Sequence, residues 1–104
     1  MLFSFKHMDR SEAIEQAARE AFEGVMTKFS QKPTSFQVIF SVNRKFQSVH
    51  LSAHLADGHQ IELEQGEDDI YKAIDHTAEK LDRDLRKHKN KMLARRKEPK
   101  LAQA

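Results

Sequence analysis

Apolar and polar residues alternate in four short segments of the chain, and this period of two predicts four β-strands. In the first segment, Phe3 and Phe5 alternate with Ser4 and Lys6. The second and third segments are rich in aromatic and β-branched side chains, which are typical of strands. The four predicted strands cover residues 2–6, 36–42, 49–55 and 61–63.

Polar turns separate the last three predicted strands. Residues 43–45 join the second strand to the third, and Asp57-Gly58, the strongest turn signal in the chain, joins the third to the fourth. Because short connections of this kind pair neighbouring strands in opposite directions, we expect an antiparallel sheet.

Two further segments have apolar residues at spacings of three and four, which predicts amphipathic helices. The first covers residues 10–29 and begins at a capping box formed by Asp9 and Glu12, and Gly24 weakens it by about 1 kcal/mol relative to alanine. The second begins at the acidic residues 67–69, which suit the positive end of a helix dipole. Its apolar stripe continues over about six turns through Ile70, Ile74, Ala78, Leu81, Leu85, His88 and Met92.

The predicted order is β-α-β-β-β-α, an α+β fold in which two helices cover one face of a four-stranded sheet. Six helical turns span about 33 Å, against roughly 20 Å for a six-residue strand. We therefore expect the basic end of the second helix to project past the core. The apolar pattern ends after Arg96, which predicts a domain of residues 1–96 and a flexible basic tail of residues 97–104.

The composition suits one small domain, since 38% of the 104 residues are hydrophobic. No apolar run approaches the roughly 18 residues of a membrane span, and the apolar start of the chain is too short for a secretory signal. The absence of cysteine excludes disulfides and cysteine zinc sites. We expect a cytoplasmic monomer that does not associate with membranes.

Charge is distributed unevenly along the chain. Residues 80–100 contain ten basic and three acidic residues, a net charge of +7, whereas the rest of the chain carries −5. Around an ideal helix, four of these cations share one flank within an arc of about 80°: Lys80, Arg83, Lys87 and Lys91. Arg86 and Lys89 fall on the opposite flank among acidic residues. A flank of one sign predicts a polyanionic partner, nucleic acid first, and a solvated helix face is the alternative.

Patterns that indicate catalysis or metal binding are weak. His50 and His54 are separated by about 13 Å on a strand, which is too far to share a metal ion. Asp68 and Asp69 are interpreted as helix-start residues, and the chain has no glycine-rich phosphate loop or nucleophile elbow. We therefore expect no catalytic residue, no metal site and no cofactor. A metal-dependent enzyme that uses these histidines or His59 is an alternative that stoichiometric metal in the purified protein would support.

A dense motif lies in the last predicted helix. It reads Asp68-Asp69-Ile70-Tyr71-Lys72-Ala73-Ile74-Asp75 and continues with Glu79-Lys80-Leu81-Asp82-Arg83-Asp84-Leu85-Arg86-Lys87-His88-Lys89. This motif resembles the signature of the bacterial ribosome hibernation promoting factor family, which includes protein Y. The order of the preceding strands agrees, so the resemblance covers residues 2–91 and implies the same β-α-β-β-β-α fold in a protein that is not an enzyme.

The resemblance implies a factor that binds the small (30S) ribosomal subunit in stress or stationary phase. Family members occupy the decoding channel, compete with messenger and transfer RNA, and protect idle ribosomes. The short form, which this chain resembles, helps to form ribosome dimers alongside a separate ribosome modulation factor, whereas protein Y has a longer tail and opposes dimers. The tail of residues 93–104 falls between these two types. The implied contacts of the last helix with 16S ribosomal RNA are Lys80, Arg83, Arg86, Lys87, Lys89 and Lys91.

The first predicted helix departs from the family pattern. Ala21 and Gly24 stand where many members carry lysine, and most exposed positions are acidic: Glu12, Glu15, Glu20 and Glu23. Ribosome binding is then either weaker or supported by additional RNA contacts at Lys6, Arg10, Lys28, Arg44 and Lys45. The alternative function is a protein-interaction module, of the transcription-factor modulator type, that uses the acidic first helix.

Overall fold

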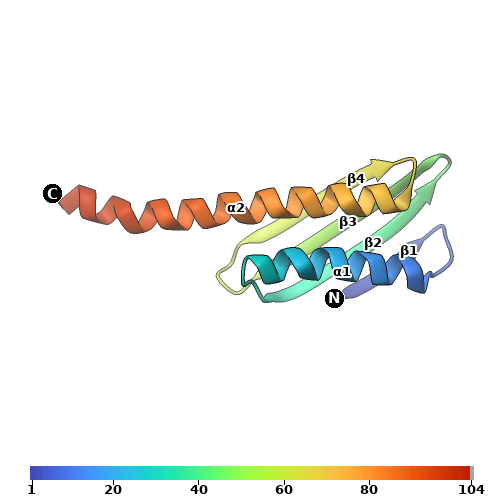
Figure 1. Ribbon diagram of the computed structural model, residues 1–104, viewed down its shortest axis with the longest axis horizontal. Coiled ribbons are helices and arrows are strands. Elements are labelled where there is room, and N and C mark those ends of the chain that lie inside the picture. The colour runs from blue at the N-terminus through green and yellow to red at the C-terminus, as the bar shows by residue number, and fades with distance from the viewer. Residues whose placement is uncertain (104) are drawn as a thin grey trace.

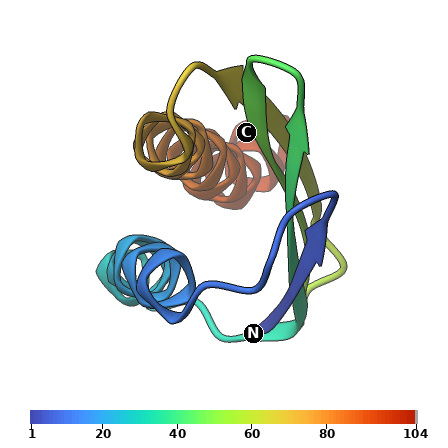
Figure 2. The same cartoon turned by 90° about the vertical axis from the view of Figure 1, so that its right-hand side faces the viewer.

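Two helices cover one face of a four-stranded sheet in this protein (Figure 1 and Figure 2). The computed structural model describes the backbone of residues 1–103 and the side chains of residues 1–94. The fold class expected from the sequence is confirmed. The elements are, in order, β1 (Leu2–Lys6), α1 (Glu12–Lys28), β2 (Pro33–Asn43), β3 (Phe46–Leu55), β4 (Gln60–Glu67) and α2 (Ile70–Gln103).

The strands lie side by side in sequence order, but the sheet is mixed. β1 pairs with β2 in parallel, so the expectation of an antiparallel sheet is wrong for this pair. The reason is that α1 connects these two strands, and a helical crossover returns the chain to the same end of the sheet. The β2–β3 and β3–β4 pairs are antiparallel, as the short turns predict.

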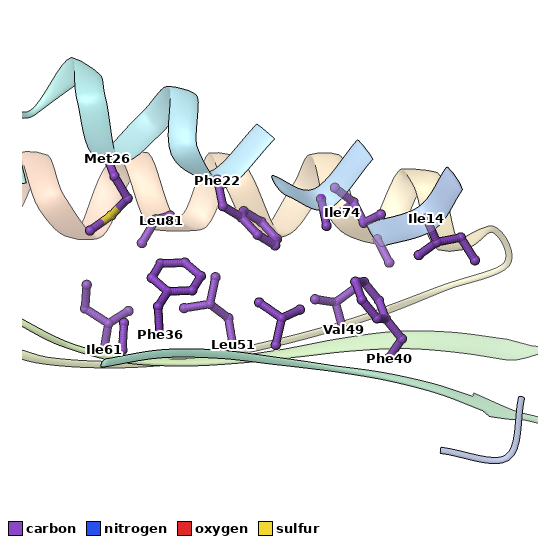
Figure 3. Packing of buried hydrophobic residues seen from close by; sticks show 14 of the residues in the cluster. Ile14, Phe22, Met26, Phe36, Phe40, Val49, Leu51, Ile61, Ile74 and Leu81 are labelled. Atoms are coloured by element: carbon purple, nitrogen blue, oxygen red, sulfur yellow. The ribbon is translucent and has the colours of Figure 1, made fainter. Parts of the chain in front are cut away.

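The core lies between the sheet and the two helices (Figure 3). The buried stripe of α2 is shorter than predicted, because Leu85 is 2% exposed whereas Met92, about two turns later, is 38% exposed. His88 between them is half-buried and lies beside the β3–β4 turn, where the sheet ends. On α1, the buried positions recur every four residues: Ile14, Ala18, Phe22 and Met26.

The remainder of α2 projects beyond the sheet as a single helix (Figure 1), as the predicted lengths require. The helix has 34 residues, and the molecule measures 59 Å along its longest axis but only 22 Å and 18 Å along the others. The side chains of the predicted tail, residues 97–104, lie outside the described residues, and the division at residue 96 stays a prediction.

The start of α1 differs from the predicted capping box. Ser11, not Asp9, caps this helix, since its Oγ accepts a hydrogen bond of 3.3 Å from the backbone N–H of Ile14. Ser11 has extended backbone angles (φ −128°, ψ 119°), which is the usual conformation of a capping residue.

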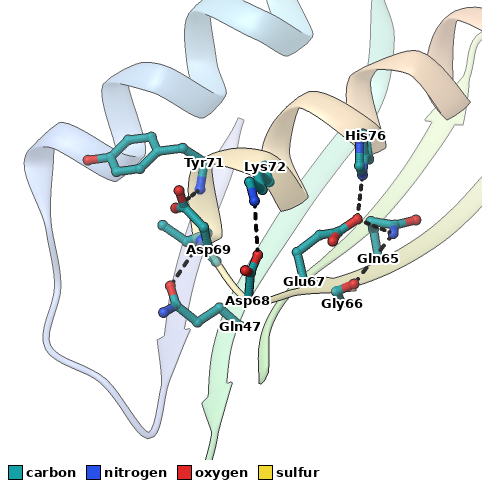
Figure 4. Close-up of polar contacts among 10 residues, drawn as sticks. Gln47, Gln65, Gly66, Glu67, Asp68, Asp69, Tyr71, Lys72 and His76 are labelled. Carbon is teal, nitrogen blue, oxygen red and sulfur yellow. Dashed lines mark hydrogen bonds and ion pairs between the residues drawn. The ribbon is translucent and has the colours of Figure 1, made fainter. Parts of the chain in front are cut away.

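α2 also begins later in the chain than predicted, at Ile70 (Figure 4). Glu67 belongs to β4, where it continues the pairing with β3, so it does not open the helix. The carboxylate of Asp69 accepts a hydrogen bond from the backbone N–H of Tyr71, and the side-chain oxygen of Gln47 accepts one from that of Ile70, each at 2.9 Å. These two acceptors satisfy N–H groups that have no partner within the helix.

Gly24 allows a test of the helical assignment of α1, because an added Cβ there would have no atom within 4 Å. We expect Gly24→Ala to raise the free energy of unfolding by about 0.5–1 kcal/mol, since alanine loses less backbone entropy. The control Gly58→Ala should lower it by about 1 kcal/mol, because Gly58 has a φ of 94°. Urea denaturation followed by circular dichroism measures both changes, and a loss of stability in Gly24→Ala would contradict a regular helix at this position.

Candidate nucleic-acid interface

One side of α2 carries four cations, which we call the cationic flank: Lys80, Arg83, Lys87 and Lys91. The structure brings them together along two adjoining depressions between α2 and the strands. Lys80, Arg83 and Lys87 line the first with Leu63 of β4, and Lys87 and Lys91 line the second beside the β3–β4 turn. Within residues 1–94, none of the four forms an ion pair. Their charges are therefore available to an external anion.

Lys80 differs from the other members of the cationic flank because its head group is already engaged. Its Nζ donates a hydrogen bond of 3.0 Å to the backbone carbonyl of Glu64 on β4. A carbonyl group is neutral, so Lys80 keeps its full charge while its side chain is held against the sheet. Arg83, Lys87 and Lys91 are exposed and unrestrained by comparison.

The opposite flank of α2 is partly neutralised by Asp82. Lys28 of α1 approaches its carboxylate to 2.7 Å and Arg86 to 3.0 Å. The pKa of Asp82 lies below its ordinary value, mainly because Lys28 donates a hydrogen bond to the carboxylate, with the charge of Arg86 acting in the same direction. Lys28 and Arg86 are thus committed to an internal contact, whereas Lys89 is exposed and has no ion pair within residues 1–94.

The additional cations expected from the sequence do not join the cationic flank. Arg10 forms an ion pair of 3.0 Å with Glu15. Lys6 pairs with Ser41 near the end of β2, and the β2–β3 turn follows immediately with the remaining two cations, Arg44 and Lys45. This end of the sheet is where α2 begins, so it is opposite to the projecting part of α2 (Figure 1). Any anion that contacts both groups must extend along the whole molecule.

The exposed side of α1 is acidic, as the sequence indicates. Glu12, Glu20 and Glu23 are exposed, and Arg19 lies 3.7 Å from Glu23. This arrangement gives α1 no cationic surface comparable to that of α2.

The histidines that could suggest a metal site belong to separate polar contacts. His50 Nε2 lies 2.8 Å from the carboxylate of Glu62, and His54 lies 3.2 Å from the hydroxyl of Ser35, both on the sheet face that the helices leave open. No group of three potential ligands that could hold a metal ion occurs in the part of the chain whose side chains are described. Among the described helices, none is both long enough and apolar enough to cross a membrane.

Sequence reasoning missed the surroundings of His88. The apolar spacing placed this residue in the core stripe, but in the structure its ring lies in the second depression with His59, Asp57 and Asp84. The contacts join the β3–β4 turn to α2 over separations of 25 and 31 residues in the sequence. No local pattern signals such a contact, because it depends on how the hairpin packs against the helix.

The fold and the cationic flank together are typical of a small polyanion-binding α+β protein. Comparison with known families then identifies the family to which the chain belongs. The chain belongs to the Sigma 54 modulation protein / S30EA ribosomal protein family, whose model matches residues 2–93. The hibernation factors of this family are ribosome-binding proteins and not enzymes.

Individual relatives support the same assignment. The ribosome hibernation promoting factor of Azotobacter vinelandii is 33% identical over 88 residues, which is 85% of this chain and 80% of that protein. The factor of the same name from Pseudomonas putida is 34% identical over 88 residues, which is 85% of this chain and 84% of that protein.

Solved structures show the same fold at low sequence identity. A ribosomal subunit interface protein from Coxiella burnetii superposes with a TM-score of 0.77 at 22% identity, over 86% of this chain and 96% of that one. The N-terminal domain of protein Y from Thermus thermophilus superposes with a TM-score of 0.73 at 16% identity, over 85% of this chain and 99% of that one.

The role of Asp82 in neutralising one flank can be tested by removing its charge. We expect Asp82→Asn to strengthen binding to polyuridylic acid about three- to tenfold at low salt, because it releases Lys28 and Arg86 for phosphate contacts. Asp75→Asn is the matched control, since Asp75 is an exposed carboxylate on the same helix without an ion pair in residues 1–94. Titrations monitored by fluorescence anisotropy measure both affinities. Equal strengthening by the two variants would show that only net charge matters.

Proposed function

We propose that this protein is a ribosome hibernation factor that inactivates the small ribosomal subunit by occupying its decoding channel. The observation that carries the proposal is the cationic flank, which has no ion-pair partner within residues 1–94 and lies on a helix that extends past the core. Such a helix end can enter a groove between RNA backbones without displacing the folded domain. Family membership and the hibernation factors among its relatives support the ribosome as the partner.

The proposed binding mode uses phosphate contacts without base recognition. Lysine and arginine neutralise phosphates and release counterions, which gives affinity without sequence preference. Arg86 shares Asp82 with Lys28 and is expected to contribute less than its neighbours. Bound in this way to 16S ribosomal RNA, the protein would exclude messenger and transfer RNA from the channel and preserve idle ribosomes in the cytoplasm during stress or stationary phase. The proposed contacts are Lys80, Arg83, Lys87, Lys89 and Lys91, with Arg86 secondary.

A protein-interaction role is the second candidate. It is favoured by the acidic exposed side of α1, with Glu12, Glu20 and Glu23, and by the words "Sigma 54 modulation protein" in the family description. A complex held by RNA contacts should dissociate on nuclease treatment or at high salt. A captured partner that survives both treatments would favour the interaction role.

Charge reversal on the cationic flank tests the proposed contacts. We expect Arg83→Glu combined with Lys87→Glu to abolish co-sedimentation with vacant small subunits, because two attractive contacts become repulsive. The matched control is Lys32→Glu with Lys72→Glu, which changes the net charge equally at exposed lysines outside the cationic flank. Both variants should keep the wild-type circular dichroism spectrum. Undiminished binding of the flank variant would refute these contacts.

The salt dependence of binding tests the number of phosphate contacts. Five or six contacts predict a slope of about −5 in a plot of log K against log salt concentration. Sedimentation with vacant small subunits across a salt series measures this slope, and competition with initiator transfer RNA then tests the location. A slope near zero would show that phosphate contacts do not drive binding.

A further inference from the structure

Two histidines form a stacked pair at the base of the projecting part of α2. The rings of His59, after the β3–β4 turn, and His88, on α2, lie 4.0 Å apart between centroids and within 8° of parallel. Each ring is bound to a carboxylate on the other element. His59 Nε2 lies 2.7 Å from Asp84 on α2, and His88 Nε2 lies 2.6 Å from Asp57 in the turn.

These contacts determine which nitrogen of each neutral ring carries the hydrogen. A carboxylate only accepts hydrogen bonds, so Nε2 of each histidine carries the hydrogen in the neutral state. In both rings Nδ1 has no hydrogen-bond partner among the described residues, so this nitrogen is the one left to contact an external phosphate. The pKa of the Asp57 carboxyl lies below its ordinary value, first because the backbone N–H of His59 donates to it and then because of His88, so this carboxylate stays charged.

The charged groups around the pair nearly balance while the histidines are neutral. Asp57 and Asp84 supply two negative charges, and two lysines, Lys87 and Lys91, line the same depression. The net charge is thus zero with neutral rings and +2 when both are protonated. Two imidazolium rings at 4.0 Å repel each other. A bound phosphate relieves this repulsion and so favours the charged form of the pair.

We propose that the His59–His88 pair is a phosphate-binding subsite, continuous with the cationic flank, that binds RNA more tightly as the pH falls. The inference rests on the proposed function, because it assigns additional groups to the same RNA interface. The direction of the pH dependence follows from the thermodynamic linkage between proton binding and phosphate binding. A ligand that prefers the protonated pair raises the histidine pKa values on binding, so its affinity increases as the pH decreases through the range where histidine titrates.

The test is the affinity for vacant small ribosomal subunits at pH 6 and pH 8 at constant ionic strength. We expect wild-type protein to bind about tenfold more tightly at pH 6, which corresponds to the uptake of one proton over about half of this range of two pH units. His59→Asn combined with His88→Asn should remove most of this difference. The matched control is His50→Asn with His54→Asn on the open sheet face, which should retain it.

A second measurement uses only wild-type protein and so does not depend on the folding of the variant. Mixing with small subunits in weakly buffered solution near pH 6.5 should consume about one proton for each bound protein. Equal affinity at both pH values, no proton uptake, or an unchanged pH dependence in the His59/His88 variant would each overturn the inference while leaving ribosome binding intact. Absence of binding at either pH would instead overturn the proposed function, and this inference with it.

Discussion

The burial of the first half of α2 against the sheet is the constraint on which the charged surface depends. Between Ile70 and Leu85 this helix keeps one face in the core, and even Thr77 is fully buried there, with its hydroxyl bonded to the carbonyl of Ala73 at 2.7 Å. This packing fixes the rotation of the helix about its axis. The cations on the solvent side therefore have defined directions, although none of them contributes to the core.

The end of the sheet divides α2 into two parts with different roles. Within residues 1–94, Leu85 is the last residue of α2 that is buried in the core, and beyond it His88 of this helix contacts Asp57 in the β3–β4 turn. The apolar requirement then disappears, and basic residues can occupy positions that would be buried one or two turns earlier. Because the sheet is shorter than the helix, α2 packs in the folded domain with its first part and forms a projecting basic segment with its second part.

Neighbouring carboxylates decide which cations remain available. Asp82 holds Lys28 and Arg86, whereas Asp57 and Asp84 hold histidines and leave the adjacent lysines unpaired within residues 1–94. Asp82 and Asp84 lie two residues apart on the same helix but affect a polyanion differently. Asp82 engages two cations, whereas Asp84 contacts a histidine and leaves the neighbouring lysines without an ion pair within residues 1–94. In the proposed binding mode, a phosphate backbone would meet one open flank instead of an evenly charged cylinder, which favours a defined orientation of the protein on RNA.

Much of the fold follows from local sequence patterns. Short-range patterns predict the strand at residues 36–42, the turn at Asp57-Gly58 and the helix that carries the stripe from Ile70 to Leu85. The structure contains each of these elements. The cationic flank was also predictable, because Lys80, Arg83 and Lys87 share a helix whose period is known. The family motif added the ribosome, which composition and charge alone do not specify.

Contacts between distant segments were decided only by the tertiary structure. The parallel pairing of β1, the attachment of Lys28 to Asp82 and the stacking of His59 on His88 each join residues more than twenty positions apart. Local periodicity carries no information about such pairs, because it reports which face a residue occupies and not what lies opposite. The sequence by itself determined the elements and the charge of the last helix. The packing of those elements determined which of its charges are neutralised and which face an external partner.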